Sequence, residues 1–238
     1  MNIALIGYGK MGKAIHEILK TRGHHADLII DLSNAQDLTA EAIKKVDVAI
    51  EFTSPHTAYQ NVSFCLQQGV PVVCGSTGWL DRLEEVKKLA TQNNTGLIVA
   101  SNFSVGVNLF FELNKRLAHL MNAQPAYEIQ LTEIHHTAKK DAPSGTAISL
   151  AEQILEAIPR KQKWVNTASR NPSELSIVSE RIDPAPGTHH VKYSSEIDDI
   201  EIIHTAHNRT GFAYGAVLAA EFLKGKAGFF GMKEVLNL

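Results

Sequence analysis

The chain begins with a short apolar segment that runs directly into a glycine-rich turn. Residues 3–6 are apolar, and the hexapeptide GYGKMG at residues 7–12 follows at once. Residues 10–20 then have the spacing of an amphipathic helix. In such a G-x-G-x-x-G turn the first glycine permits the bend, the second lets a pyrophosphate approach the backbone, and the third lets helix and strand pack closely. The feature predicts a Rossmann-type dinucleotide-binding fold.

The next ninety or so residues repeat the alternation of strand and helix. Strands are expected at residues 27–30, 46–52, 70–73 and 96–100, and helices at residues 55–67 and 81–92. A strand–helix–strand rhythm predicts a parallel sheet with helices on both faces.

The pattern changes after Asn102. We expect a long helix at 105–121, a strand at 127–136 and a second helix at 144–158, then strands at 175–182, 187–194 and 197–206 and a last helix at 213–224. Strands that follow one another without helices predict an antiparallel or mixed sheet that is open on one side. The expected fold is therefore α/β, with an N-terminal Rossmann-type parallel sheet (residues 1–104 plus 210–238) and an inserted α+β domain of mixed sheet (105–209). The last helix should pack back on the first domain.

Three further features bear on the coenzyme. The second expected strand leads to Asp31, whose carboxylate can accept hydrogen bonds from an adenine ribose and so favours NADH. Lys10 in the glycine turn can instead meet a 2′-phosphate, which leaves NADPH open. The loops at 75–78 and 100–103 follow parallel strands, and ligands of open α/β sheets bind beyond the carboxyl ends of strands. Both loops are expected to border the nicotinamide.

The densest group of reactive side chains lies at residues 133–146, between an expected strand and an expected helix. Ser144 is a good N-cap, and Gly145 and Thr146 would offer free N–H groups and a hydroxyl to a substrate carboxylate. His135, His136 and Lys139 add proton donors to the same loop.

Three simpler explanations of this loop compete with a catalytic one. A histidine pair can bind metal, but this is no H-E-x-x-H helix and no carboxylate or cysteine stands at ligand spacing from it, so no metal is expected. Lys139 and Lys140 can be a solvated pair, and one of two adjacent strand histidines can be structural. The convergence of proton donors with an anion-binding helix end favours catalysis. The second pair, His189 and His190, is expected at the surface.

Composition excludes several other classes of protein. The chain has 23 Lys+Arg and 25 Asp+Glu, a formal net charge of −2, so it has no basic surplus for nucleic acid or anionic membranes. No apolar run is long enough to span a membrane, and no secretory leader is expected before the first strand. Cys65 and Cys74 fit neither a redox pair nor a zinc site and are expected to be buried thiols. These features together predict a cytoplasmic protein without nucleic-acid or membrane partners.

Three segments, in order, resemble the dihydrodipicolinate reductase family over nearly the whole chain. Residues 133–147 are similar to the family's E-x-H-H-x-x-K-x-D-A-P-S-G-T-A signature, residues 75–78 (GSTG) to its GTTG loop, and residues 102–108 (NFSVGVN) match a third segment. The chain departs from the family in being shorter between Gln153 and Val191, in a glycine turn one residue shorter than in many members, and in having Ser54 where some members have arginine.

The resemblance implies reduction of the cyclic dicarboxylate 4-hydroxy-tetrahydrodipicolinate to tetrahydrodipicolinate by NADH or NADPH, in lysine and diaminopimelate biosynthesis. It further implies a homotetramer built through the sheets of the inserted domain, which would also bind substrate, and closure of the two domains. His135 would be the proton donor and acceptor and Lys139 a proton donor, while His136, Gly145 and Thr146 would bind a substrate carboxylate. The residues implied at the coenzyme are Gly7, Tyr8, Gly9, Lys10, Met11, Gly12, Asp31, Gly75, Ser76, Thr77, Ala100, Ser101, Asn102 and Phe103.

Two other functions compete with this one. A different two-domain dehydrogenase, acting on an amino or keto acid, would need another substrate loop than the one at residues 135–146. A non-enzymatic Rossmann module that senses the ratio of NADH to NAD would have no need of clustered proton donors beside an anion site.

Overall fold

The computed structural model describes residues 1–208 and 210–238, and its contacts divide the chain into two compact units. The first unit comprises Met1–Asn108 and Arg209–Leu238, and the second comprises Leu109–Asn208. Arg209, the last residue of the expected inserted domain, lies outside the described residues. Among the helices of the described residues, none is both long and apolar enough to cross a membrane.

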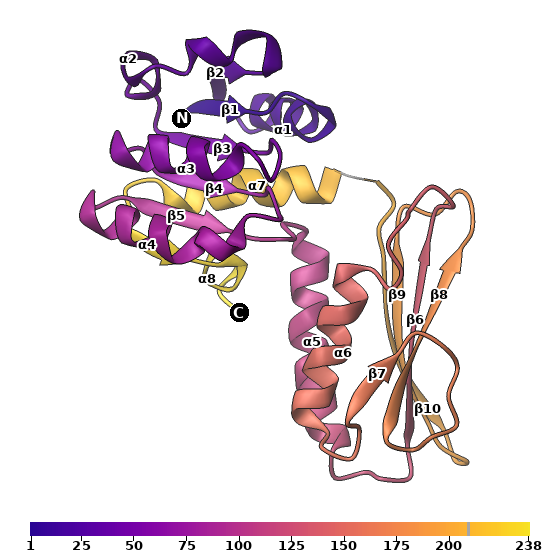
Figure 1. Ribbon diagram of the computed structural model, residues 1–238. Coiled ribbons are helices and arrows are strands. Elements are labelled where there is room, and N and C mark those ends of the chain that lie inside the picture. Colours follow the sequence, from indigo (N-terminus) through magenta and orange to yellow (C-terminus); the bar gives the residue numbers. More distant parts are fainter. Residues whose placement is uncertain (209) are drawn as a thin grey trace. The chain divides into compact units, whose positions relative to one another are not determined.

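The first unit is built on a six-stranded parallel sheet (Figure 1). Its strand order is β11-β5-β4-β3-β1-β2. Register pairs the last residues of neighbouring strands, Ile6 with both Ile30 and Glu51, so the carboxyl ends of the strands lie level along one edge. The strands are β1 (Asn2–Ile6), β2 (His25–Ile30), β3 (Val48–Glu51), β4 (Val72–Cys74), β5 (Gly96–Val99) and β11 (Gly228–Phe230).

Helices cover both faces of this sheet, as predicted, because alternate strand residues point to opposite sides. Ala4 and Ile6 pack towards α3 and α4, whereas Ile3 and Leu5 pack towards α1 and α7. The covering helices are α1 (Lys10–Thr21), α3 (Ala58–Gln67), α4 (Leu83–Gln92) and α7 (Thr210–Leu223). Shorter helical segments are η1 (Leu32–Asp37), α2 (Ala40–Ile43), η2 (Leu80–Arg82) and α8 (Met232–Leu236).

The last long helix, α7, packs on the first unit, which confirms the prediction made for it. Its buried face is rich in alanine and glycine, so its backbone approaches the sheet closely. A Cβ added at Gly215 would come within 1.7 Å of the carbonyl oxygen of Phe103. On the flank towards α1, the Arg22 guanidinium donates to Glu221 at 2.7 Å.

The second unit contains a five-stranded mixed sheet, which confirms the expected sheet type. Its order is β10-β9-β6-β8-β7; β8 runs parallel to β6 and β7, and β9 runs antiparallel to β6 and β10. Helices α5 and α6 lie side by side along one face (Figure 1), where Asn114 of α5 donates to the Leu150 carbonyl of α6. The elements are α5 (Val105–Met121), β6 (Glu128–His135), α6 (Gly145–Ala157), β7 (Lys163–Val165), β8 (Glu174–Arg181), β9 (Thr188–Ser194) and β10 (Asp199–Thr205).

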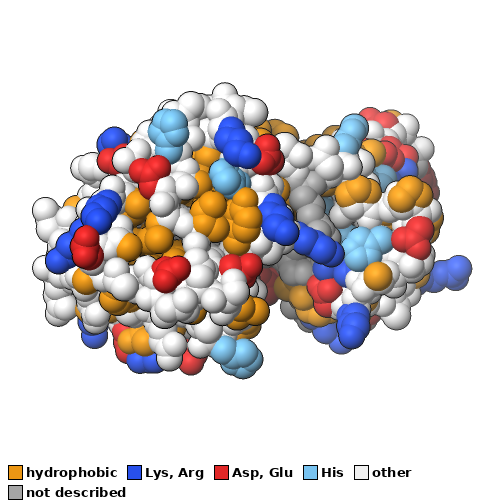
Figure 2. Space-filling model, turned by 90° about the horizontal axis from the view of Figure 1, so that it is seen from above, with side chains coloured by type: hydrophobic (Ala, Val, Ile, Leu, Met, Phe, Trp, Pro, Cys, Tyr) orange, Lys and Arg blue, Asp and Glu red, His pale blue; other side chains and the backbone are white. Residues whose placement is uncertain are grey.

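Helices cover one face of this second sheet, whereas the other face is more exposed. Leu131 and Val191 point into a core with α6, and Ile202, opposite Val191, packs against the same core. Ile203 is paired with His190 on the other face and is 58% exposed. Acidic and basic side chains are interspersed over the part of the surface shown in Figure 2, in line with the small net charge.

Candidate active site

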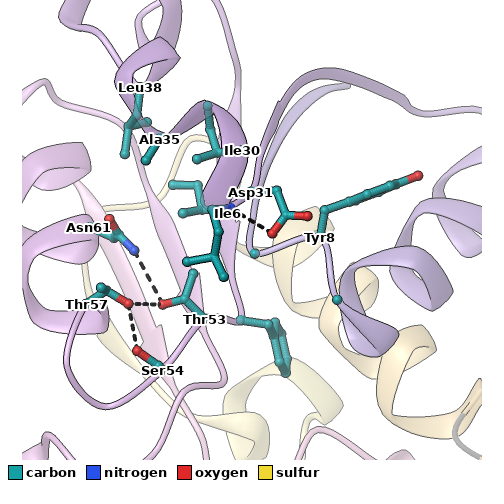
Figure 3. Close-up of a pocket in the computed structure, with 14 residues that line it drawn as sticks. Ile6, Tyr8, Ile30, Asp31, Ala35, Leu38, Thr53, Ser54, Thr57 and Asn61 are labelled. Carbon is teal, nitrogen blue, oxygen red and sulfur yellow. Dashed lines mark hydrogen bonds between the residues drawn. The ribbon is translucent and has the colours of Figure 1, made fainter.

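A cavity of about 290 Å³ opens at the carboxyl ends of β1, β2 and β3 in the first unit (Figure 3). The strand order places β1 between β2 and β3, so the chain leaves β1 in one direction and β3 in the other. In open α/β sheets, such a switch of direction is where ligands bind. The cavity is lined by Ile6, Gly7, Tyr8, Gly9, Ile30, Asp31, Leu32, Ala35, Leu38, Phe52, Thr53, Ser54, Thr57 and Asn61.

The glycine turn has the form that a pyrophosphate needs. Gly7 has φ +98°, and a Cβ there would lie 2.1 Å from the Phe52 carbonyl oxygen. A Cβ at Gly12 would lie 2.1 Å from the Gly7 carbonyl oxygen, so both positions require glycine for packing within the protein. Gly9, by contrast, has nothing within 4 Å of an added Cβ. It is the N-cap of α1 and no side chain caps the helix, so N–H groups face open space where a phosphate fits.

Asp31 lies on the cavity, where a ribose hydroxyl could reach it. Its carboxylate accepts from its neighbour Leu32 N at 2.8 Å, and its own N–H donates to the Asn34 side chain at 2.7 Å, which fixes the turn after β2. Among the described residues that line the cavity, Asp31 has the one charged side chain. Apolar side chains such as Ile30 and Leu38 form a wall suited to a base. The residues fit an adenine dinucleotide.

The glycine turn contributes to the cavity only in part. Gly7, Tyr8 and Gly9 line it, whereas Lys10 and the two residues that follow do not. Sequence reasoning missed Thr53, Thr57 and Asn61, and it noted Ser54 only as a departure from the family. The available signal for Thr53 and Thr57 was their position between a buried parallel strand and the next helix, at the same edge as the glycine turn, whereas Asn61 lies within α3.

The two other predicted coenzyme loops lie at the same edge of the sheet. Gly75 N donates to the Glu51 carbonyl at 2.9 Å, and Ala100 N donates to the Cys74 carbonyl at 3.2 Å. Ser76 Oγ accepts from Thr53 N at 2.8 Å and so joins one of these loops to the cavity wall. None of the residues predicted at the coenzyme in these loops, 75–77 and 100–103, lines the cavity itself, and Phe103 is buried beside Phe52 with ring centroids 5.7 Å apart.

In the second unit, the loop between β6 and α6 holds the predicted substrate-binding and proton-donating residues. His135 is the last residue of β6, and Gly145 is the first of α6. Ser144 caps the helix, since its Oγ accepts from Ala147 N at 3.2 Å. The N–H groups of Gly145 and Thr146 have no acceptor within the helix, and an added Cβ at Gly145 would meet nothing within 4 Å. This helix end is therefore open to an anion.

Within this loop, Lys139 has a defined anionic partner. Its Nζ donates to both oxygens of Asp141, at 2.8 and 2.9 Å, and its side chain is 23% exposed. These hydrogen bonds hold the pKa of Asp141 below its ordinary value. Further along the loop, Thr137 N donates to Asp183 at 3.2 Å. The ammonium group of Lys139 is thus held by Asp141 within the loop and does not extend freely into solvent.

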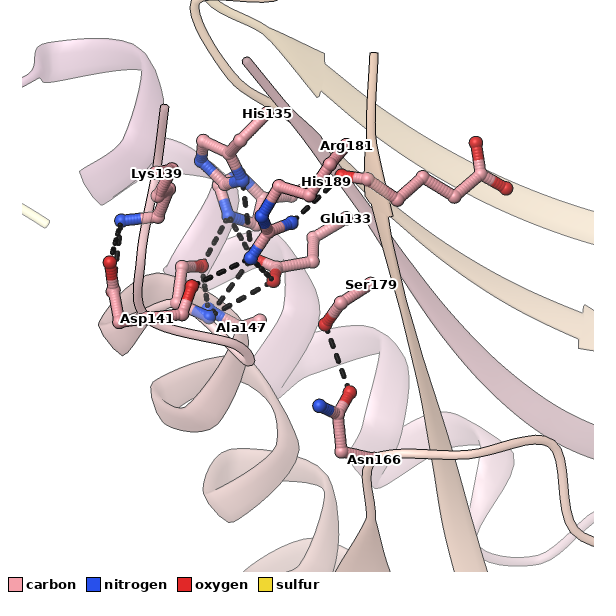
Figure 4. A network of polar contacts seen from close by, with 11 residues as sticks. Glu133, His135, Lys139, Asp141, Ala147, Asn166, Ser179, Arg181 and His189 are labelled. Carbon is pink, nitrogen blue, oxygen red and sulfur yellow. Dashed lines mark hydrogen bonds and ion pairs between the residues drawn. The ribbon is translucent and has the colours of Figure 1, made fainter. Parts of the chain in front are cut away.

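Glu133 is fully buried at the centre of a polar network (Figure 4). Ser144 N lies 3.1 Å from each of its carboxylate oxygens, and the Arg181 guanidinium donates to one of them at 3.1 Å. His135 Nδ1 lies 3.3 Å from the other oxygen. Burial alone would raise the pKa of Glu133, but the donors of His135 and Ser144 outweigh it and hold the pKa well below its ordinary value.

His189 belongs to the same network. The prediction that His189 and His190 lie at the surface is wrong for His189, which is 5% exposed. Register places it opposite Glu133 on the face that α5 and α6 cover. Its Nε2 lies 3.1 Å from Ser144 Oγ, and its ring meets that of His135 edge-on at 5.2 Å. Burial first, and then the charge of His135, lower its pKa to about 4.

Glu133, His135 and His189 form the one group of possible metal ligands found among the described residues, with ligand atoms within 4.8 Å of one another. From the sequence, no carboxylate is expected at ligand spacing from the histidines, but Glu133 and His135 lie on the same face of β6, and the pairing of β9 with β6 brings His189 to them. Both of its oxygens already accept from Ser144 N, and Arg181 donates to one. A divalent cation would have to compete with these donors and with the guanidinium charge.

Comparison with known proteins identifies the family. Residues 1–103 match the family described as dihydrodipicolinate reductase, N-terminus, and residues 106–236 match dihydrodipicolinate reductase, C-terminus. The 4-hydroxy-tetrahydrodipicolinate reductase of Christiangramia forsetii is 46% identical over 100% of this chain and 98% of that protein. Its counterpart in Neisseria gonorrhoeae is 34% identical, over 91% of this chain and 81% of that protein.

A solved structure that is similar to this chain bears the name of the same family. The dipicolinate-bound dihydrodipicolinate reductase from Paenisporosarcina sp. TG-14 is similar with a TM-score of 0.78 and 26% identity, covering 98% of each chain. The matches extend over both units, from the glycine turn to the loop between β6 and α6. The chain therefore belongs to the dihydrodipicolinate reductase family.

Proposed function

We propose that this chain reduces 4-hydroxy-tetrahydrodipicolinate to tetrahydrodipicolinate with NADH or NADPH, in lysine and diaminopimelate biosynthesis. The observation that carries the proposal is the loop in which His135 and Lys139 stand beside the open N-terminus of α6, in a chain that also holds a coenzyme cavity. The relatives bear the name of this activity, and the similar solved structure has a dicarboxylate, dipicolinate, bound.

The residues of this loop and of the first turn of α6 have distinct roles in the proposed reaction. The N–H groups of Gly145 and Thr146, with His136, bind a carboxylate of the substrate. The reduced nicotinamide supplies the hydride when it is bound. His135 and Lys139 supply the proton that the reduction also consumes, and the 4-hydroxyl group of the substrate leaves as water. The carboxylate of Asp141 holds the ammonium group of Lys139 within the loop between β6 and α6.

We also propose that NADH is the preferred coenzyme. The 2′-phosphate of NADPH would meet the carboxylate of Asp31, and no cationic side chain among the described cavity residues would offset that repulsion. Lys10, the one residue of the glycine turn suited to a phosphate, does not line the cavity. Asp31 can instead accept a hydrogen bond from the ribose of NADH.

The experiment that tests the function is coupled oxidation of NADH, and in parallel NADPH, with substrate generated by the preceding synthase. The wild type should oxidise both and favour NADH. We expect His135→Ala and Lys139→Ala to lower kcat about 100-fold or more, because each removes a proton donor. NADH affinity, measured by fluorescence titration, should be unchanged, since neither residue lines the coenzyme cavity.

Lys140→Ala is the matched control, because Lys140 is the exposed neighbour of Lys139 in the same loop. It should retain wild-type turnover. Equal turnover in all three variants would contradict the catalytic assignment, and no oxidation of either coenzyme by the wild type would contradict the proposed reaction.

We further infer a cytoplasmic homotetramer. The first unit would hold the coenzyme, and the second would bind substrate and form the contacts between subunits. The open face of the second sheet supports the last point, because it carries the half-exposed Ile203, and the described helices of the second unit, α5 and α6, pack on the opposite face.

A further inference from the structure

Glu133 is a buried charged residue that the proposed chemistry does not use. It opens the signature stretch at residues 133–147, yet it is 0% exposed and so cannot meet solvent as a surface carboxylate would. Burying a charge is costly unless donors replace the lost water. Here the groups that face the carboxylate come from the N-cap of α6, from β8 and from β6 itself: Ser144, Arg181 and His135.

The sheet register explains why these donors meet. Along β6, alternate residues point towards α5 and α6, and Glu133 and His135 are two of them. Strand pairing places Arg181 of β8 opposite His135, and His189 of β9 opposite Glu133. The N-cap of α6, Ser144, completes the set. In Figure 4 the side chains of His135, Arg181 and His189 all converge on the carboxylate of Glu133.

The contacts link two parts of the site that have different tasks. On one side the carboxylate accepts from Ser144 N, at 3.1 Å from both oxygens, and so holds the first turn of α6, whose N–H groups bind an anion. On the other side His135 Nδ1 lies 3.3 Å from Oε2. At the far end of the same ring, Nε2 lies where a Cβ at Gly187 would come within 3.1 Å, so a glycine keeps that end clear.

We propose that Glu133 is a positioning residue, whose carboxylate fixes the ring of the proton donor His135 relative to the anion-binding end of α6. The assignment rests on the proposed function. One anionic group thus sets the orientation of the ring through Nδ1 and leaves Nε2 for the substrate.

Other charged groups pack around Glu133. Arg181 donates to one carboxylate oxygen from β8, His189 stays neutral because its pKa is lowered to about 4, and Lys139 and Asp141 pair with each other in the loop. Arg181 also donates to the Asp141 carbonyl at 2.6 Å, so the same guanidinium contacts both Glu133 and the loop.

The test uses the full-length enzyme and three variants: Glu133→Gln, Glu133→Asp and, as a control, Glu152→Gln on the exposed side of α6. We expect Glu133→Gln to lower kcat at least about tenfold and to weaken dipicolinate binding, measured by calorimetry, because a neutral amide holds Ser144 N and the ring of His135 less firmly than a carboxylate does. Glu133→Asp keeps the charge but retracts the carboxylate, so kcat should fall in this variant as well. Glu152→Gln should match the wild type, and NADH affinity should be equal in all four proteins.

Several results would overturn the proposal. A Glu133→Gln enzyme with wild-type kcat would do so, and a lowered kcat with wild-type dipicolinate affinity would reduce the residue to a structural role. If Glu133→Gln does not fold, Glu133→Asp decides: wild-type kcat in that variant would contradict a role in positioning.

Failure of the proposed reaction is a separate outcome, because it appears in the wild type as an absence of NADH oxidation. In that case calorimetry with dipicolinate tests the link to α6 directly. Weaker dipicolinate binding by Glu133→Gln or Glu133→Asp would support the positioning of the helix end, and equal binding would overturn it.

Discussion

Burial keeps the imidazole of His189 neutral near pH 7. The ring lies in the second unit between Ser144 and His135, with 5% of the residue exposed. Its pKa is lowered to about 4, chiefly because the charged form would lose its hydration and secondly because His135 is close. A neutral ring can accept a hydrogen bond from the hydroxyl of Ser144, so the N-cap of α6 depends on this protonation state.

This shift makes stability depend on pH in a defined direction. Between about pH 6.5 and pH 4 the unfolded chain binds a proton at His189 that the folded chain does not, so the free energy of unfolding falls as pH falls. A shift of this size corresponds to about 3 kcal/mol over that range. Denaturant titrations at pH 7, 6, 5 and 4 measure the effect.

The control for this prediction is His189→Gln, which has no titrating group at the position. Its stability should fall less steeply between pH 6.5 and pH 4. The lowered pKa of Glu133 does not confuse the result, because that carboxylate loses its stabilising effect only as pH falls below the ordinary range of glutamate. Parallel slopes in wild type and variant would show that His189 titrates normally.

Residues that act through neighbours in the sequence could be predicted, and residues that act across strands could not. His135, Lys139 and Thr146 lie in one short stretch of sequence, from the end of β6 to the first turn of α6, and the N-cap of α6 follows from Ser144 alone. His189 looks like a surface residue in its own segment. Its burial arises only from the pairing of β9 with β6, which no local pattern specifies.

At the level of elements, the contact between β1 and α1 depends on glycine for two different reasons. Gly12 faces the Gly7 carbonyl inside the protein, whereas Gly9 faces open space at the N-terminus of α1. The first position serves packing and the second serves the ligand, although both belong to the same short motif.

Alanine substitutions should separate these two roles. We expect Gly12→Ala to lower the free energy of unfolding by about 1–3 kcal/mol, because its Cβ would collide with backbone rather than with a flexible side chain. Gly9→Ala should change stability by less than about 0.5 kcal/mol, since φ is −77° and nothing lies near. It should weaken NADH binding about tenfold or more, measured by fluorescence titration. A Gly12→Ala protein with wild-type stability, or a Gly9→Ala protein with wild-type affinity for NADH, would contradict this assignment of separate roles.

The length of a helix or strand decided whether it could be predicted from the sequence. The helix at Val105–Met121 and the strands β6, β9 and β10 are long enough for their periodicity to be read, and they were predicted within two residues at each end. The strands β7 and β11 have three residues each and were missed. So short a segment has no period, and its strand character comes from the neighbour that it pairs with, β8 or β5.

At the level of the whole molecule, the open face of the second sheet is where the inferred tetramer can be tested. Ile203 is 58% exposed on this face, whereas Ile197, 91% exposed, lies in the turn between β9 and β10. We expect Ile203→Glu to give smaller species in analytical ultracentrifugation, because a carboxylate buried between subunits would lack a partner. Ile197→Glu, the same change outside the sheet face, should remain tetrameric. A tetrameric Ile203→Glu protein would exclude this face as the subunit contact.

The second unit is inserted within the first, and this has a consequence for the order in which the chain folds during synthesis. All of the second unit has been translated by Asn208, but the first unit still lacks β11 and α7 at that point. Until α7 arrives, one face of the parallel sheet lacks its cover over β3, β4 and β5 and exposes Ile50, Val73 and Ile98. On the ribosome the second unit can therefore complete its core first, while the nascent first unit is the part of the chain that a chaperone would bind.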